Sequence, residues 1–393
     1  MSAWELATFP AEMLGDPPAP EGVDVDVVRP GEAVRVTHVL DAVEPRIRPD
    51  GRAAFPSEPK AGEGRTNRIA GVTVLACLDF PAEERPLHEQ ESLVDMAGPG
   101  AGLTPFSETT NVVLTFRPSP GVPNEETEAW ARRTTLEVAE ALARPTLGAE
   151  PAEVERFELG PADDLPAVAA LLQLSDLGPL YYQYVYGVPA GQAGLPLPVD
   201  PAEVLDGAIT CGEYHWAALR NPTLFFQQNR LVRTLYREHG KSLRFAGVVL
   251  MRGYEQTAAE KARAAERAAA LAAELGADGA VITTDAGGNS HTDVMLTCRA
   301  CEQAGIRTTV IVAEMADPGS TNPGLTDWVP EADSIVSVGN AEETVAAWRP
   351  ERVVGGDVLL DGTPAAEAGE IPVRNYLGAT NQMGQLALTA TTW

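Results

Sequence analysis

The second half of the chain alternates apolar runs with helical patterns, and this alternation constrains the fold more than any other feature. The runs suited to buried strands are 245–251, 279–283, 308–313 and 334–338, and the helical patterns between them are 257–275 and 292–303. Strands and helices that alternate at this spacing form a parallel sheet with covering helices and right-handed crossovers. The sequence therefore predicts an α/β fold whose C-terminal half is a Rossmann-like parallel sheet with covering helices.

The first half has a less regular pattern. Apolar runs at 71–80 and 111–116 predict buried strands, and 125–144 predicts a helix. A chain of 393 residues is long for one ordinary core, and prolines interrupt it near 196–201. We therefore expect an N-terminal mixed α/β domain of residues 1–204 and a C-terminal Rossmann-like α/β domain of residues 205–393.

The charge balance excludes several classes of partner. Lys and Arg number 29 against 56 Asp and Glu, a formal net charge of −27, which argues against binding to nucleic acid or anionic membranes. An anionic small substrate would need a local basic pocket. With four cysteines, no recognisable signal peptide and no apolar run long enough for a membrane span, we expect a cytoplasmic protein without a disulfide framework.

A polar loop follows the predicted strand 279–283, at the edge of the sheet where ligands bind in open α/β folds. It carries Asn289, His291 and Asp293. Three polar groups at such a place seldom serve packing alone, so we predict that they bind substrate. The loop lacks the G-x-G-x-x-G fingerprint of dinucleotide sites. One histidine among scattered carboxylates matches no strong ligand spacing, so no metal is predicted.

The cysteines fall into three settings. Cys77 lies in an apolar strand and is expected in the core, while Cys298 and Cys301 form a C-x-x-C inside a predicted helix. Such a pair exchanges disulfides when it sits at a helix N-terminus. This pair lies about two turns further on, which favours buried, inert thiols but leaves redox activity open.

Cys211 stands in the segment 206–216, after a small residue and before a glycine. A thiol so placed can attack the preceding carbonyl and form a thioester. Elimination and hydrolysis then leave a pyruvoyl group, an electron sink that condenses with amines. Glu213 and His215 are candidate proton-transfer groups beside Cys211, although His215 is equally a candidate packing residue. The tripeptide at 210–212 is common and does not establish cleavage by itself.

Short motifs in order along the chain resemble the precursor subunit of component B of the glycine/sarcosine/betaine reductases. They span about residues 30 to 384 and include 29–36, 43–46, 64–67, 95–99, 105–111, 184–187, 206–209, 221–222, 288–289, 292–293 and 378–381. The resemblance implies an oxidoreductase subunit that begins the reductive cleavage of a C–N bond in a small amino acid or amine. It further implies an internally cut chain with a pyruvoyl group and a second subunit bearing cysteine or selenocysteine. D-proline reductase uses a related cut subunit.

The chain departs from this family at the processed cysteine, which in the family follows an asparagine a few residues after Gly-Ala-Ile. A gap-free alignment places Tyr214 at that position, and Cys211 lies three residues earlier. Either Cys211 has taken over the role, or the chain is an uncleaved substrate-binding or scaffold subunit for a cysteine- or selenocysteine-bearing partner. A Rossmann-like nucleotide-binding enzyme outside the family is a third reading.

Within the first reading, we expect 205–216 and 284–293 to converge on one pocket. The carboxylate of an amino-acid substrate needs a basic contact, which arginine can make through two hydrogen bonds. Arg46 and Arg65, with Asn67 beside them, are the predicted substrate-binding residues for that contact. The substrate itself and the oligomeric state do not follow from the sequence.

Overall fold

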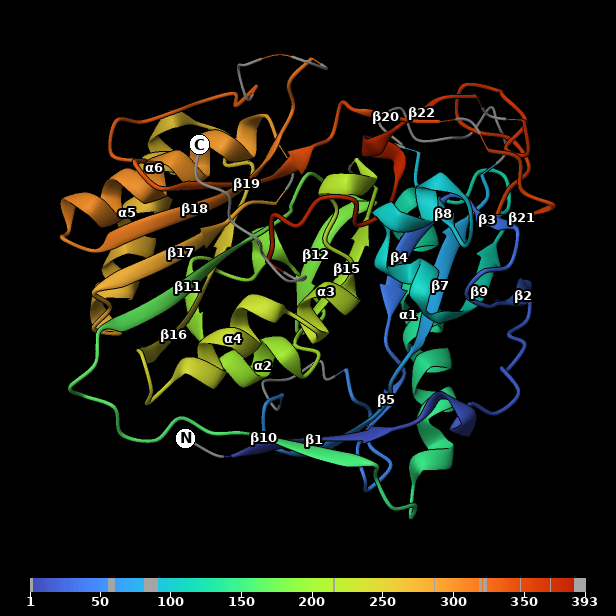
Figure 1. Ribbon diagram of the computed structural model, residues 1–393, viewed down its shortest axis with the longest axis horizontal. Coiled ribbons are helices and arrows are strands. Elements are labelled where there is room, and N and C mark those ends of the chain that lie inside the picture. The colour runs from blue at the N-terminus through green and yellow to red at the C-terminus, as the bar shows by residue number, and fades with distance from the viewer. Residues whose placement is uncertain are drawn as a thin grey trace.

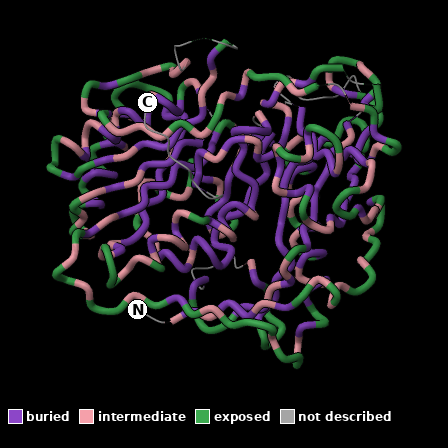
Figure 2. The backbone as a smooth tube through the Cα atoms, in the orientation of Figure 1, coloured by how far each residue is buried: buried purple, intermediate pink, exposed green. Residues whose placement is uncertain are grey.

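The computed structural model describes residues 3–55, 61–80, 91–214, 216–285, 287–317, 320, 324–346, 348–367 and 369–384. The molecule is mixed α/β, with a large sheet on the left of Figure 1 and a second layered unit on the right. Figure 2 shows buried chain running through both, while exposed residues gather in the connections. None of the helices in the described ranges combines the length and apolar character that a bilayer span requires.

The large sheet carries most of the second half of the chain. Its strands, in spatial order, are β14 (Leu197–Val199), β16 (Arg244–Arg252), β11 (Ala167–Leu174), β17 (Gly279–Thr283), β18 (Arg307–Glu314) and β19 (Ile335–Asn340). All neighbours pair in parallel except β14, which runs antiparallel to β16. The predicted strands of the second half are confirmed to within a few residues.

Helices cover both faces of the large sheet. The helices α5 (Ala258–Glu274) and α6 (Asn289–Gln303) pack their apolar sides on one face. The other face packs against α2 (Pro201–Leu205) and α4 (Arg230–Glu238). Successive β11 residues enter the two cores in turn, as the alternation of side chains along a strand requires.

Two features of the large sheet differ from the sequence-based expectation. The run 167–174, for which no strand is predicted, forms the interior strand β11, and β14 also comes from before residue 205. The predicted boundary after residue 204 therefore passes through this sheet. The helix α6 begins at Asn289 rather than at 292, because Gly288 adopts a positive φ of 67° and acts as its N-cap.

The second unit is a sheet covered by one long helix. Its strands, in spatial order, are β2 (Val23–Val28), β9 (Thr110–Phe116), β7 (Val72–Leu78) and β4 (Val39–Val43). The helix α1 (Asn124–Ala143) buries Ala131, Val138 and Leu142 against them. The predicted strands at 71–80 and 111–116 and the predicted helix at 125–144 are confirmed.

Smaller sheets connect distant parts of the chain. One has the order β10 (Glu153–Phe157), β1 (Trp4–Phe9), β6 (Gly64–Ile69) and β5 (Arg46–Ile47), and it lies along the bottom of Figure 1. Another joins β21 (Arg352–Val354) to β3 (Val34–Val36) and β8 (Val94–Asp95), and β20 (Thr344–Val345) pairs with β22 (Ile371–Pro372). The pairing of β21 with β3 ties the end of the chain to its beginning.

A small central sheet lies between the large sheet and the second unit (Figure 1). It has the order β13 (Val188–Pro189), β12 (Tyr181–Val185) and β15 (Ile209–Glu213), and α3 (Thr223–Gln227) follows it in the chain. Because β15 contains Cys211, this sheet positions the candidate site.

Candidate functional site

The register of β12 and β15 decides which side chains share a face. Gln183 lies opposite Cys211, and Tyr184 lies opposite Thr210. Successive residues of a strand point to opposite faces. Cys211 and Gln183 therefore share one face of the central sheet with Glu213, which we call the acid face. Thr210, Tyr184 and the neighbouring Gly212 share the other, which packs on α1 and which we call the helix face.

The acid face surrounds Cys211 with polar groups rather than with hydrocarbon. The Cys211 side chain is fully buried, and its backbone N–H donates to Thr223 Oγ1 at 2.9 Å. The Thr223 hydroxyl in turn donates to Asp41 Oδ2 at 2.7 Å. On the thiol side, Cys211 Sγ lies 4.0 Å from Glu213 Oε2. The residue thus has a carboxyl group within reach of its sulfur and a second one linked to its nitrogen.

A buried pair of carboxyl groups joins this segment to the edge of the large sheet. Gln183 Nε2 donates to Glu213 Oε2 at 3.1 Å and to Asp285 Oδ1 at 3.2 Å. Asn221 Nδ2 donates to the same Asp285 oxygen at 2.7 Å. Asp285 follows the carboxyl end of β17, so the segments 205–216 and 284–293 do meet, through Glu213 and Asp285.

Burial governs the protonation of these groups. It raises the pKa of Asp41 to about 7, against hydrogen bonds from Thr223 and the charge of Arg220. Burial and the neighbouring Asp285 raise the pKa of Glu213 well above its ordinary value. Burial, with help from Asp41 and Glu213, also raises the pKa of the Cys211 thiol. The thiolate is therefore disfavoured in the folded chain, and a thiol attack here needs a base.

Ser175 lies beside both acids of the acid face. Against the larger effect of burial, its hydroxyl acts as a hydrogen-bond donor that lowers the pKa of Glu213 and of Asp285. The fully buried Arg220 guanidinium lowers the pKa of Glu213 and of Asp41, so it favours the ionised form of both acids.

The predicted substrate-binding residues of α6 are held away from the acid face. Asp293 pairs with Lys261 at 2.7 Å and accepts from the N–H of Tyr254, while Asn289 Nδ2 donates to the Glu255 carbonyl at 3.4 Å. His291 Nδ1 accepts from the N–H of Thr326 at 3.3 Å, and burial lowers the His291 pKa to about 4. Asn289, His291 and Asp293 contact the segment after β16 and the loop after β18. Among the described residues of 284–293, Asp285 is the one with a hydrogen bond to Gln183.

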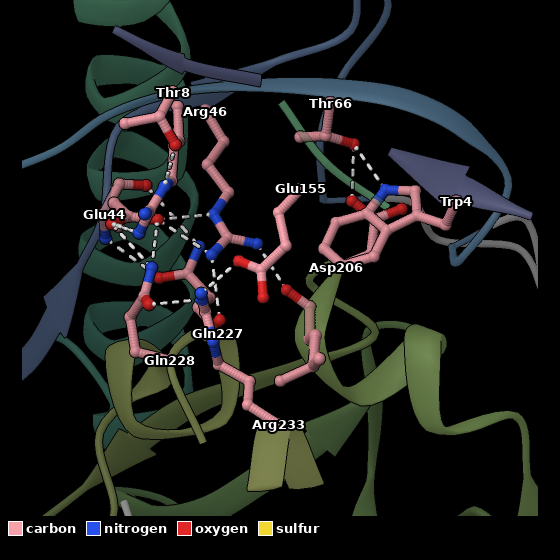
Figure 3. Close-up of polar contacts among 12 residues, drawn as sticks. Trp4, Thr8, Glu44, Arg46, Thr66, Glu155, Asp206, Gln227, Gln228 and Arg233 are labelled. Atoms are coloured by element: carbon pink, nitrogen blue, oxygen red, sulfur yellow. Dashed lines mark hydrogen bonds and ion pairs between the residues drawn. The ribbon is translucent and has the colours of Figure 1, made fainter. Parts of the chain in front are cut away.

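The predicted carboxylate-binding residues belong to the lower sheet. The buried Arg46 forms an ion pair with Glu44 at 2.8 Å and donates to the carbonyls of Leu205 and Gln227, within the polar network of Figure 3. Arg65 is exposed and pairs with Glu5 at 2.7 Å, and Asn67 donates to Thr146. Each already has partners in the chain, and no contact joins them to Cys211. Their predicted role in substrate binding stays a prediction.

The sequence also singled out three further cysteines and His215. The expected burial of Cys77, Cys298 and Cys301 is confirmed, and Cys298 Sγ contacts Thr308 Oγ1 at 3.2 Å. His215, the candidate proton-transfer residue, lies outside the described residues. In the described ranges, no three His, Cys, Asp or Glu side chains gather in a way that could hold a metal ion.

Comparison with known proteins identifies the family. A family model for glycine/sarcosine/betaine reductase component B subunits matches residues 11–389. The chain belongs to this family. No solved structure matches the chain.

Members of the component B family from three complexes are similar over most of their length. Component B subunits alpha and beta of the glycine reductase complex of Acetoanaerobium sticklandii are 33% identical, covering 95% of this chain and 90% of the relative. The component B subunit alpha of the sarcosine reductase complex of Peptoclostridium acidaminophilum is 34% identical, covering 93% and 84%. The betaine reductase counterpart from that organism is 30% identical, covering 88% and 85%.

Several residues of the acid face were not predicted from the sequence. Asp41, Thr223 and Gln183 come from segments that lie far apart in the chain, and no motif connects them. Asp285 had a signal, because it follows a predicted buried strand directly and a carboxylate there seldom faces only hydrocarbon. Tyr214, which the sequence analysis placed at the expected position of a processed cysteine, is fully buried and donates to the His38 carbonyl at 2.9 Å.

Proposed function

We propose that this chain is a subunit of a complex of the glycine/sarcosine/betaine reductase type, and that this complex cleaves a C–N bond of a small amino acid or amine. Its family and the names of its relatives support the reaction class. A second subunit bearing cysteine or selenocysteine supplies the reducing thiol or selenol. The contribution of this chain centres on Cys211.

The observation that carries the proposal is that titratable groups lie on both sides of the Thr210–Cys211 bond, one near the sulfur and one linked to the nitrogen. Glu213 Oε2 lies 4.0 Å from Cys211 Sγ, and its raised pKa makes it an effective base in its ionised form. On the other side of the bond, Asp41 has a pKa of about 7 and is linked to the Cys211 nitrogen by Thr223, whose hydroxyl accepts from that nitrogen and donates to Asp41. A base for the sulfur and an acid for the nitrogen are what self-cleavage requires.

These groups fit a balanced processing reaction. The Cys211 sulfur bonds to the Thr210 carbonyl carbon as the C–N bond breaks, and Glu213 takes the thiol proton. Protonated Asp41 supplies a proton to the leaving nitrogen once the Thr223 hydroxyl, which accepts from that nitrogen and donates to Asp41 in the structure, reverses its hydrogen bonds. Loss of the Cα proton of residue 211 then expels the sulfur from Cβ as a thiocarboxylate on Thr210, which water hydrolyses to a carboxylate and hydrogen sulfide. The dehydroalanine that remains tautomerises to an imine, and its hydrolysis releases ammonia and leaves a carbonyl at residue 211. A pyruvoyl group there would supply an electron sink that condenses with the substrate amine.

Denaturing mass spectrometry of the purified full-length protein tests the processing. We expect two fragments that meet at residue 211, with the C-terminal one reactive toward a hydrazine. Cys211→Ala should give one intact chain, whereas Cys298→Ala, a matched change at another buried cysteine, should be cleaved like the wild type. Thr223→Val should slow cleavage because it breaks the route from Asp41 to the nitrogen. A single wild-type mass near 41.6 kDa would contradict the processing.

One specific observation favours a second candidate, an uncleaved subunit that presents substrate to the catalytic partner. β15 is an ordinary strand paired along its length with β12. The gap-free alignment of the sequence analysis, which puts Tyr214 rather than a cysteine at the position expected to be processed, supports the same candidate. Both candidates predict that the reconstituted complex releases an amine or ammonia from glycine, sarcosine or betaine only when this chain is present. Equal release without the chain would contradict both, whereas an intact mass with chain-dependent release selects the uncleaved candidate.

A further inference from the structure

His38 is buried beneath a segment from near the end of the chain, residues 355–360, which follows β21 at the right of Figure 1 and which we call the strap. The His38 side chain is 2% exposed. Its Nδ1 lies 3.4 Å from Glu91 Oε1, and its Nε2 lies 3.1 Å from the Val358 carbonyl oxygen of the strap. Both ring nitrogens therefore face acceptors. A neutral imidazole donates from one nitrogen, whereas the imidazolium donates from both, so these contacts select the protonated ring.

Glu91 binds both His38 and the strap. Its Oε2 accepts from the N–H of Leu360 at 3.0 Å, and its Oε1 accepts from the N–H of Ser92 at 3.2 Å. Burial alone would raise the pKa of Glu91, but the hydrogen bond and the charge of His38, with those two N–H groups, bring it below its ordinary value. Glu91 is therefore ionised at neutral pH, and the charge of this pair that changes there belongs to the histidine.

The strap packs directly on the imidazole because Gly356 has no side chain. A Cβ at residue 356 would lie 2.5 Å from Cδ2 of the His38 ring. Gly355 before it has a φ of 106°, and a Cβ there would lie 2.3 Å from the Thr37 carbonyl oxygen. Thr37 Oγ1 also donates to the Gly356 carbonyl at 2.8 Å and accepts from the Gly356 N–H at 2.7 Å. The strap is thus close enough to the ring for its position to depend on the ring's charge.

The backbone of His38 connects the strap to the acid face. His38 has a positive φ of 55°, which is uncommon for a residue with a side chain, and backbone strain of this kind occurs at switch regions. Its carbonyl accepts from Tyr214 Oη at 2.9 Å, and the next carbonyl, that of Val39, accepts from the Arg220 guanidinium. Asp41 of the acid face lies three residues after His38. The strap and the acid face therefore share one short piece of backbone.

Besides Glu91, titratable and charged groups of the described chain surround His38 from three elements. They are Cys77 in β7 and Asp79 directly after it, Tyr214 after β15, and Arg220 after the turn at 217–219. Burial raises the pKa of the Cys77 thiol, so Cys77 stays neutral at ordinary pH. Asp79 pairs with Arg117 at 3.2 Å, so these two charges offset each other. Tyr214 and Arg220 bind the backbone carbonyls described above. Glu91 is therefore the acid that favours the charged ring.

We propose that His38 and Glu91 form a pH-dependent latch, which fixes the strap while the His38 ring is protonated and releases it when the ring loses its proton. Burial of the ring opposes its charge, but both ring nitrogens have acceptors and one of these is an ionised carboxylate. An unperturbed histidine titrates at about pH 6.5. Because the latch binds the charged form, it holds fully below that pH and is lost as the pH rises above it. The latch does not depend on the chemistry proposed for Cys211.

Hydrogen exchange of the purified full-length protein tests the latch. Mass spectrometry reads the protection of peptides that cover the strap and of peptides from α5, at about pH 5.5, 7 and 8.5, after correction for the intrinsic exchange rate. As the pH rises, the strap should lose at least about tenfold more protection than α5, as for the loss of a charge-assisted hydrogen bond. His38→Asn, which tolerates a positive φ but does not titrate, should leave the strap poorly protected at every pH and abolish this extra loss.

Glu91→Gln keeps the size of the side chain and provides a second variant in case His38→Asn unfolds the chain. It should remove most of the extra loss, because a neutral amide does not select the charged ring. His239→Asn is the matched control, since His239 Nδ1 accepts from the Phe245 N–H at 3.0 Å, and it should respond as the wild type does. A wild-type strap that loses no more protection than α5 would overturn the latch. An extra loss that persists in both latch variants would overturn it too and would belong to Asp41, whose pKa is about 7.

Discussion

The two faces of the central sheet differ in how their buried acidic side chains are hydrogen-bonded. On the acid face, Glu213 and Asp285 share the Gln183 amide and the Ser175 hydroxyl as donors. On the helix face, each oxygen of Glu128 has its own donor, one from Arg132 and one from Tyr184. The acid face thus divides its donors between two acids, whereas the helix face gives two donors to one acid.

This difference follows from the alternation of side chains along a strand. Cys211 and Thr210 are neighbours in sequence, but their side chains lie on opposite faces of β15. The two residues therefore have different surroundings: Cys211 lies among the buried acids, whereas Thr210 lies on the side that packs on α1.

The largest expected effect comes from removing the donor that joins the two acids. Gln183→Met preserves the volume but deprives Glu213, Asp285 and the Asn221 carbonyl of a hydrogen bond. We expect a loss of about 3 kcal/mol in the free energy of unfolding, because buried acceptors are left without partners. Urea denaturation measures it.

The matched change on the helix face is Tyr184→Phe, which removes one hydrogen bond from an acid that keeps its arginine. Its expected cost is about 1 kcal/mol. Equal losses for the two variants would show that the faces do not differ in the way described.

A smaller effect concerns pH. Burial raises the pKa of Asp285 above its ordinary value, so the folded chain holds that proton more tightly than the unfolded chain. The stability from this group is present below the unfolded pKa of about 4 and is lost as pH rises through the folded pKa near 7. Asp285→Asn removes this dependence.

The variant should therefore gain stability relative to the wild type between pH 5 and pH 8, by on the order of 1–2 kcal/mol. Urea denaturation at both pH values measures the difference. Asp50→Asn, at a fully exposed carboxyl group, should show no such gain. A constant difference for Asp285→Asn across the range would mean that the acid pair is ionised throughout.

The sequence predicted the regular elements well because their signals are local. The strands and helices after residue 245 follow from hydrophobic periodicity and from end signals such as Gly276. The central strand β11 lay in a run with no helix or turn pattern around it, and its membership in the large sheet depends on pairing with strands more than 70 residues away. Non-local pairing of this kind leaves no local pattern.

The candidate site was predicted only in part, for the same physical reason. Cys211 and Glu213 were found because they lie in one short segment, and the approach of 284–293 followed from the sheet edge. The partners that set their protonation, Asp41 and Gln183, reach the site from separate strands.

The smallest expected effect on stability comes from Thr210, on the helix face. Thr210→Val replaces a buried hydroxyl that has no partner in the described ranges with a methyl group of similar size. The wild type bears the desolvation of that hydroxyl without a compensating bond, so the variant should be equally stable or more stable by up to about 1 kcal/mol.

The matched change on the acid face is Thr223→Val. Its hydroxyl accepts from Cys211 and donates to Asp41, so its removal takes a partner from the Cys211 N–H and from Asp41 Oδ2 and should destabilise by about 2 kcal/mol, while Asp41 Oδ1 keeps its two backbone donors. Thermal unfolding of both variants without substrate compares them. A destabilised Thr210→Val would show that the hydroxyl already has a partner in the folded chain.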